Sequence, residues 1–179
     1  MKTKRTAPVL LFVLAWISHA YGQDERLTDA QIAGVVFVAN QAEIAAGESA
    51  LRRTQSRSVQ ALAKRIVAEH AQVNQEIIAL TQRLAANLQR SAISDALSKQ
   101  SDDDLARLNE VAARGFDQAY LDREVTNLQQ LVNAVDTFIR TATSADLKML
   151  LVRFRPFFIL HLDQAQRLEL AIGTPEIGR

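Results

Sequence analysis

The sequence contains no cysteine. This absence excludes disulfide bonds, thiol nucleophiles, thiol redox chemistry and the acylated cysteine of a lipoprotein. Met149 is the only methionine after the initiator, which argues against a copper carrier with thioether ligands. The folded protein must therefore draw its stability from a packed core.

Proline and glycine are scarce in the long central part of the chain. Between residues 27 and 172 the only proline is Pro156, and the only glycines are Gly34, Gly47 and Gly115. Long stretches of Ala, Leu, Gln, Glu and Arg fill this region, and these residues favour helices over strands. Gly34 and Gly47 fall inside a predicted helix, where they indicate close approach of a neighbouring helix. We therefore predict an all-α protein.

Sequence signals for several common functions are also missing. The chain has no Gly-x-Ser-x-Gly, no P-loop and no Gly-x-Gly-x-x-Gly motif, and its serines cluster at predicted caps and loops. No catalytic constellation is found, so the sequence gives no support to an enzymatic role. The basic residues form no footprint typical of nucleic-acid binding, and we expect no nucleic-acid partner.

The amino terminus has the pattern of a secretory signal peptide. Three basic residues within the first five precede an apolar run of nine residues, and a short stretch of small and weakly polar residues follows. Ala20 and Gly22 occupy the small-x-small positions of a cleavage site between Gly22 and Gln23, with a cut after Ala20 as the alternative. A retained membrane anchor is disfavoured because a bilayer span needs roughly 20 apolar residues.

Cleavage of residues 1–22 would leave the 157 residues 23–179, which suit one domain with a core over about 27–172. The removed segment holds three of the 21 basic residues and none of the 20 acidic ones, so the mature chain has a net charge of −2 instead of +1. We expect no transmembrane segment in it.

The spacing of apolar residues predicts four long helices. A connection over 87–101 and a short helix capped by Ser101, with three aspartates in its first turn, should separate the second and third long helices. These features predict a four-helix bundle with a short extra helix in that connection. The long helices are expected from Thr28 or Asp29 to about Arg53, from Ser56 or Ser58 to Leu84, from Gly115 to Ile139, and from Ser144 to Gly173.

Each predicted long helix carries a polar residue near the middle of its apolar face. Helices rise 1.5 Å per residue, so mid-helix positions on antiparallel neighbours lie at similar depth and their side chains could form one layer. An unpaired carboxylate or imidazole costs several kcal/mol to bury, so these groups should bind each other, a water or an ion. They are Glu43, His70, Glu124 with Asn127, and His161.

Two interpretations of this layer stay open. The two imidazoles and Glu43, with Glu69, Glu124 or Asn127 nearby, could bind iron, zinc, copper or manganese. Alternatively, the layer is a hydrogen-bond network that fixes the register of the helices. A helical di-iron site needs Glu-x-x-His on two helices, but Val67 and Phe158 stand three residues before the two histidines. The spacing therefore favours the network.

Four segments of the sequence resemble domain-of-unknown-function family 4142, a ferritin-like group of exported bacterial proteins often labelled outer membrane proteins. The resemblance covers about residues 27–172 and implies a ferritin-like four-helix fold, a periplasmic or outer-membrane-associated location and no established activity. The segments are Ala42-Glu43-Ile44-x-x-Gly47-Glu48, Val67-x-Glu69-His70-x-x-x-Asn74-x-x-Ile77, Gly115-Phe116-Asp117-x-x-Tyr120 and Pro156-x-x-x-x-His161-Leu162-x-x-Ala165.

The chain departs from this family at two positions. Glu69 stands before His70 where the family usually has Asp, and Asn127 replaces an inward histidine. An amide is a poor ligand for a transition metal, so the second departure fits a hydrogen-bonded layer better than a metal site. We therefore expect an exported envelope protein with a structural or interaction role, and its partner is either another envelope protein or a second copy of the chain.

Overall fold

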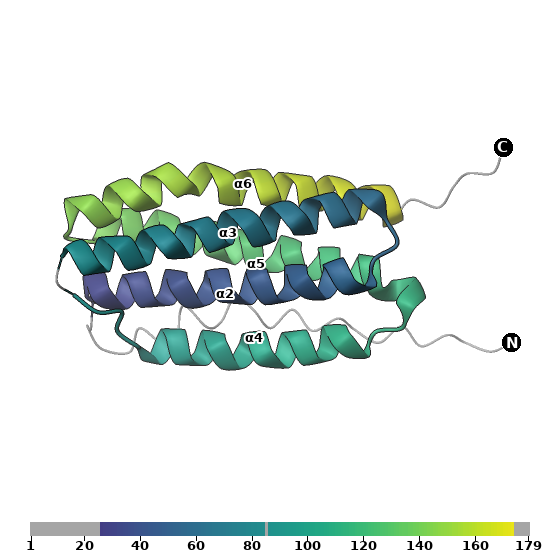
Figure 1. The fold of residues 1–179 in the computed structure, drawn as a ribbon, viewed down its shortest axis with the longest axis horizontal. Coiled ribbons are helices and arrows are strands. Elements are labelled where there is room, and N and C mark those ends of the chain that lie inside the picture. Colours follow the sequence, from purple (N-terminus) through teal and green to yellow (C-terminus); the bar gives the residue numbers. More distant parts are fainter. Residues whose placement is uncertain (1–25, 85, 174–179) are drawn as a thin grey trace, which may run out of the picture.

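The computed structural model describes residues 26–84 and 86–173 (Figure 1). The predicted signal peptide, with its cleavage site between Gly22 and Gln23, lies outside these residues. Within them the chain forms helices and no β-strand, which confirms the predicted all-α class. The helices are α2 (Asp29–Arg53), α3 (Arg57–Arg83), α4 (Ala92–Glu110), α5 (Ala113–Thr141) and α6 (Ala145–Gly173).

Three of the long helices begin at a residue whose hydroxyl side chain caps the helix, as predicted. Thr28 Oγ1 accepts the backbone N–H of Gln31 at 3.2 Å, and the Gln31 side chain accepts the backbone N–H of Thr28. Ser56 caps α3, and Ser144 Oγ accepts the N–H of Leu147 at 3.2 Å at the start of α6. These contacts satisfy amide groups that have no partner within the helix. The last helix continues through Pro156 to Gly173.

The connection between α3 and α5 differs from the prediction. It contains one helix of 19 residues, and Ser91 begins it in a capping box with Ser94. The predicted cap at Ser101 is therefore wrong, because this residue lies inside α4. Only Ser94 and Leu108 of α4 are buried, and a helix that buries so little needs no apolar stripe. The periodicity on which the prediction relied is absent for that reason.

The aspartates of α4 also have a different role from the one expected. Asp102, Asp103 and Asp104 lie beyond the first turn of α4, where they cannot complement the positive end of the helix dipole, and the acidic residue of that turn is Asp95. Asp103 instead pairs with Lys99 at 2.7 Å, and Asp104 pairs with Arg107. These exposed pairs contribute little to stability.

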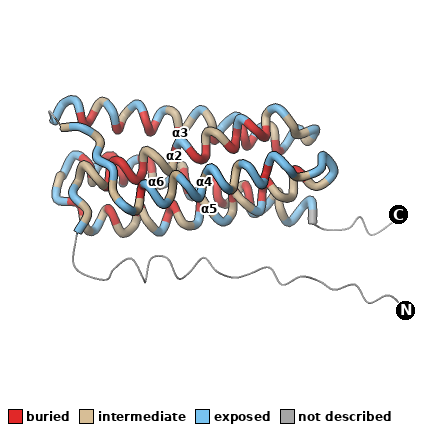
Figure 2. Tube along the Cα trace, turned by 90° about the horizontal axis from the view of Figure 1, so that it is seen from below, coloured by how far each residue is buried: buried red, intermediate tan, exposed pale blue. Residues whose placement is uncertain are grey.

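The four long helices lie side by side, and α4 lies along the outside of the molecule (Figure 1). The helix α2 packs against α3, and α5 packs against α6, while α3 also contacts α6 and α2 contacts α5. The crossover helix α4 packs mainly against α2. Buried positions recur along the inner faces of the long helices (Figure 2).

Two apolar clusters fill the interior, and polar residues lie between them. Along α3 the division falls at His70, and along α6 it falls at His161. Along α2 it falls at Asn40 and Glu43. The first cluster includes Ile32, Val36, Ile77, Leu151 and Phe158, and the second includes Ala46, Ile66, Phe116, Leu128 and Ala165. The fold thus places a polar layer inside an otherwise apolar core.

Close packing confirms the predicted approach of a neighbouring helix at Gly47, whereas the close neighbour of Gly34 is the non-helical segment before α4. A Cβ atom on Gly47 would lie 2.8 Å from Val67 Cγ2 and 3.3 Å from Ala63 O, and one on Gly34 would overlap the backbone carbonyl of Gln89. A methyl side chain at either position would have to displace α3 or the segment before α4.

We predict that Gly34→Ala lowers the free energy of unfolding by up to about 2 kcal/mol. Overpacking costs about 1–3 kcal/mol, of which the better helix propensity of alanine recovers about 1 kcal/mol. Gly115→Ala is the matched control, because its Cβ would meet only Val111 Cγ1 at 3.6 Å. Urea denaturation should show a lower free energy of unfolding for Gly34→Ala and a slightly higher one for Gly115→Ala. Equal effects would contradict the packing described here.

Candidate functional site

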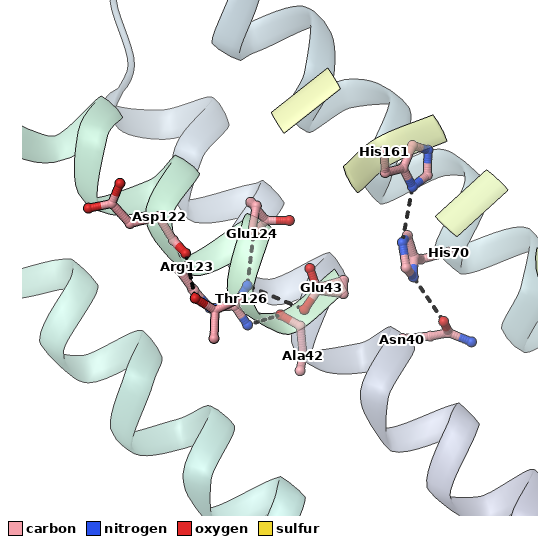
Figure 3. Close-up of polar contacts among 9 residues, drawn as sticks. All are labelled: Asn40, Ala42, Glu43, His70, Asp122, Arg123, Glu124, Thr126 and His161. Atoms are coloured by element: carbon pink, nitrogen blue, oxygen red, sulfur yellow. Dashed lines mark hydrogen bonds and ion pairs between the residues drawn. The ribbon is translucent and has the colours of Figure 1, made fainter. Parts of the chain in front are cut away.

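The buried histidines and carboxyl groups lie in two separate groups, and Figure 3 shows the central residues of each. We call the first the histidine chain; it consists of Glu69, His161, His70, Asn40 and Asn74. We call the second the arginine cluster. It consists of Arg123 with Glu43, Glu124 and Tyr120.

Hydrogen bonds connect the histidine chain across three helices. His161 on α6 contacts Glu69 on α3 through Nε2 and Oε2 at 2.8 Å, and its Nδ1 lies 3.3 Å from His70 Nε2. His70 Nδ1 lies 2.8 Å from Asn40 Oδ1 on α2. Both histidines are fully buried. Because each ring uses both of its nitrogens, neither histidine is left with an unpartnered buried nitrogen.

The histidine chain ends on the backbone of α2. Asn40 Nδ2 donates to Asn74 Oδ1 at 2.9 Å, and Asn74 Nδ2 donates to the carbonyl oxygen of Phe37 at 3.3 Å. The chain therefore links α6 through α3 to α2, and shifting any of these helices along its axis would break it.

The surroundings of the two imidazoles oppose their protonation to different degrees. Burial, together with the charges of His161 and Arg123, holds the pKa of His70 well below its usual 6.5. Its ring also packs against Phe158, with ring centroids 5.2 Å apart. Burial lowers the pKa of His161 as well, while the charge and hydrogen bond of Glu69 act in the opposite direction. His70 is consequently neutral at neutral pH.

We predict that acid destabilises the protein through His70. The folded state has the depressed pKa, so between that pKa and about 6.5 the unfolded state binds more protons. The contribution of neutral His70 to the free energy of unfolding is complete above about pH 6.5. It is lost as the pH falls, at up to about 1.4 kcal/mol per pH unit. Urea denaturation between about pH 6.5 and 5 should show this slope. His70→Gln should flatten it, and an unchanged slope would contradict the assignment.

The arginine cluster holds one buried cation between two carboxylates. Arg123 Nη1 lies 2.7 Å from Glu124 Oε1 and 3.4 Å from Glu43 Oε1, and Nη2 donates to the carbonyl oxygen of Ala42 at 3.2 Å. The side chains of Arg123, Glu43 and Glu124 are 8%, 4% and 0% exposed. Their charges are therefore poorly screened by water, and they must balance locally.

One guanidinium offsets one carboxylate, so the second carboxyl group favours its neutral form. Burial raises the pKa of Glu124 well above its usual 4.5, and the nearby charge of Glu43 acts in the same direction while Arg123 opposes it. Burial and the two carboxylates also raise the pKa of Tyr120 well above 10.0. Burial and the charge of Glu43 thus favour the neutral form of Glu124, which brings the cluster closer to electrical neutrality.

The structure buries Glu43, His70, Glu124 and His161 and separates them into the two groups. His70 and His161 come together with Glu69, whereas Glu43 and Glu124 come together with Arg123. Asn127 is only half-buried and joins neither group. Over residues 26–84 and 86–173, no set of three or more His, Asp or Glu side chains is placed to hold a metal ion. Arg123 supplies the positive charge between the two carboxylates.

The prediction from sequence missed Asn40, Asn74 and Arg123. Asn40 precedes Glu43 by three residues and Asn74 follows His70 by four, so each shares a helix face with a residue that was identified. That spacing could have revealed both. Arg123 gave no such signal, because a long side chain can reach the interior from a position beside the apolar stripe.

Two surface hollows over the described residues are lined by side chains that belong to neither polar group. The larger one, about 290 Å³, lies between α3 and α6 and is lined by residues such as Arg65, Arg167 and Leu168. The smaller one, about 200 Å³, lies between α2 and α4. Among the helices that the structure describes, none is long and apolar enough to cross a membrane.

Fold and site together define an all-helical protein with a polar layer buried between two apolar clusters. The chain matches the model of the family described as Domain of unknown function (DUF4142) over residues 18–168, and it belongs to this family. The match confirms the resemblance noted from the sequence. No curated protein and no solved structure matches the chain.

Proposed function

We propose that this protein is an exported bacterial cell-envelope protein that acts through its stability and its surface. The observation that carries the proposal is that both buried histidines are hydrogen-bonded through both ring nitrogens, and that Arg123 pairs with one oxygen each of Glu43 and Glu124, whose other oxygens have no hydrogen-bond partner. The histidine chain ends on a backbone carbonyl at 3.3 Å, and Arg123 balances the carboxylates of the second group. Neither arrangement presents a reactive group to a substrate, which favours a structural or interaction role over catalysis.

A ferritin-like relationship is part of this proposal. Four long helices with one long crossover between the second and the third are typical of ferritin-like bundles. The order α2, α3, α5, α6 with α4 as the crossover fits that description. The relationship therefore rests on helix order and packing together with the resemblance of the sequence to the family.

Export is inferred from the amino-terminal sequence. A basic start, a short apolar run and the small residues before Gln23 are typical of a cleaved signal peptide. With the family resemblance, this pattern supports a periplasmic or outer-membrane-associated location.

An interaction role is supported by apolar side chains on the outside of α6. Met149 is 67% exposed and Val152 is 49% exposed, and Ile159 and Leu160 are also exposed further along the helix. Exposed apolar residues that recur along one helix are common where a partner binds. The partner would be another envelope protein or a second copy of this chain.

Fractionation of cells that produce the full-length chain tests the proposal. We expect the protein in the periplasmic or outer-membrane fraction, with Gln23 as its first residue by mass spectrometry. The Phe12→Arg substitution, inside the apolar run, should retain the protein in the cytoplasm. Uncleaved protein in the cytoplasm of cells with the unaltered chain would contradict the proposal.

The alternative function, a metal-binding protein that uses Glu43, His70 and His161, has no observation in its favour here. Glu43 lies beside Arg123 at 3.4 Å, and the histidine nitrogens contact each other, Asn40 and Glu69. A metal ion would have to break these contacts before binding the histidines together with Glu43.

A further inference from the structure

The hydrogen bonds of the histidine chain between His161 and the backbone of α2 all run the same way from donor to acceptor. The contact with the backbone carbonyl at one end of the chain fixes this direction. A carbonyl oxygen can only accept a hydrogen bond, so the group of Asn74 that faces Phe37 O is the amide nitrogen, 3.3 Å away. The oxygen of Asn74 then faces Asn40, which must donate through Nδ2 at 2.9 Å. Neither amide can be turned around without placing two acceptors or two donors face to face.

The order of donors and acceptors continues through His70. Asn40 Oδ1 is the atom left for His70, so His70 Nδ1 carries the hydrogen of the 2.8 Å contact. A neutral imidazole has one N–H and one lone pair. His70 is fully buried beside Phe158, which favours this neutral form, and its Nε2 therefore accepts. The donor at 3.3 Å must then be His161 Nδ1–H.

The remaining contact joins His161 Nε2 and Glu69 Oε2 at 2.8 Å. With Nδ1 already carrying a hydrogen, a neutral His161 would present a lone pair to an ionised carboxylate, which has only lone pairs. We infer that the Glu69–His161 contact is a proton-binding site, and that this pair holds one proton in the folded protein at neutral pH. The pair then has no net charge, as an imidazolium with a carboxylate or as an imidazole with a carboxylic acid. Burial lowers the pKa of His161 and so opposes the imidazolium form, but the donor directions of the chain leave no other hydrogen for the contact with Glu69.

The groups around this pair come from every neighbouring long helix. Arg65 on α3 lies 4.0 Å from Glu69, and Glu43 on α2 and His70 act on the pair from inside the bundle, with Arg123 on α5 beyond them. Arg65 opposes protonation of His161, while Glu43 favours it. The Glu69 side chain is 28% exposed, so protons can exchange with solvent. The contact between α3 and α6 is thereby coupled to a proton from outside.

Loss of this proton would leave His161 with one N–H for two acceptors. It could then donate to Glu69 or to His70, and the other contact would hold two facing lone pairs. Glu69→Gln removes this conflict, because an amide N–H of glutamine can donate to the lone pair of His161 Nε2. In that variant the chain is complete without the added proton.

Nuclear magnetic resonance of the isotope-labelled protein at pH 7 tests the inference. We expect protonated Nδ1 on both histidines and unprotonated Nε2 on His70. We also expect one more proton, seen as a protonated His161 Nε2 or as the acid form of the Glu69 carboxyl carbon. An ionised Glu69 beside a neutral His161 would overturn the inference, as would an unprotonated His161 Nδ1.

The Glu69→Gln variant supplies the second arm of the test, and His161 in it should be neutral with hydrogen on Nδ1 only. Glu76→Gln is the matched control, because Glu76 also lies on α3 and pairs with Arg153 of α6 at 2.9 Å, outside the chain. The control should leave both histidine spectra unchanged. Identical His161 spectra in the wild type and in Glu69→Gln, together with an ionised Glu69 carboxyl carbon in the wild type, would also overturn the inference.

Discussion

Replacement of Arg123 by leucine is expected to lower the free energy of unfolding by about 3–5 kcal/mol, the usual loss when one partner of a buried ion pair is removed. Arg123 is the only cation that contacts Glu43 and Glu124 among the described residues, at 3.4 and 2.7 Å. Without it, the carboxyl groups are left buried without a counter-ion, and the carbonyl of Ala42 loses its side-chain donor. Guanidinium denaturation monitored by circular dichroism gives the loss directly.

Two comparisons separate this effect from a general sensitivity of α5. Arg140→Leu changes an exposed arginine of the same helix and should stay within about 0.5 kcal/mol of the wild type. Glu43→Leu alone should cost less than Arg123→Leu, because Glu124, still 2.7 Å from Arg123, can ionise and become its counter-ion once Glu43 is gone. Combined with Arg123→Leu, it should restore part of the loss, because a buried charge is removed. A full additive loss in the double variant would contradict the ion cluster.

Replacement of Asn40 by leucine should cost about 2–5 kcal/mol. This residue accepts from His70 Nδ1 at 2.8 Å and donates to Asn74 at 2.9 Å, and each buried partner left unsatisfied costs about 1–3 kcal/mol. The side chain is fully buried, so water cannot replace the lost contacts.

The control for this variant is Asn133→Leu, at an exposed asparagine of α5 that accepts from Gln129 at 3.2 Å. Chemical denaturation should place the control within about 0.5 kcal/mol of the wild type. A loss at Asn40 no larger than at Asn133 would show that the histidine chain adds nothing to stability.

The polar layer between the two apolar clusters has a structural role, because its hydrogen bonds are directional. Apolar side chains tolerate sliding of one helix along another, because their contacts are not directional. The histidine chain needs three helices in one register, since its bonds of 2.8 to 3.3 Å connect α6, α3 and α2 in turn. Polar residues in a bundle core are known to fix register in this way, and we propose the same role here.

Much of the fold could be predicted from the sequence because strong local signals mark it. Thr28, Ser56 and Ser144 provide caps, and apolar residues at spacings of three and four follow each of them. The helix α4 was misplaced because it packs on the outside through few buried residues, of which Leu108 is the only large apolar one. Its start depends on Ser91, whose capping box lies in a region without apolar periodicity.

For the candidate site, the sequence could predict only how far along the helices the polar residues lie. Mid-helix positions placed Glu43, His70 and His161 at one level; the structure buries all three and brings the two histidines into contact. Which side chains touch depends on the rotation of each helix about its axis and on side-chain length, and the spacing of apolar residues does not encode these. Arg123 shows this most clearly, because it enters the cluster from beside the apolar stripe of α5.

Metal analysis of protein purified without a histidine tag tests most directly whether the interior polar groups bind each other. We predict iron, zinc, copper and manganese each far below one atom per chain, and an unfolding transition that a chelator leaves unchanged. The contrary result would be one metal atom per chain that disappears in the His70→Ala His161→Ala double variant. That outcome would show that the histidines hold a metal ion and would contradict the hydrogen-bonded chain.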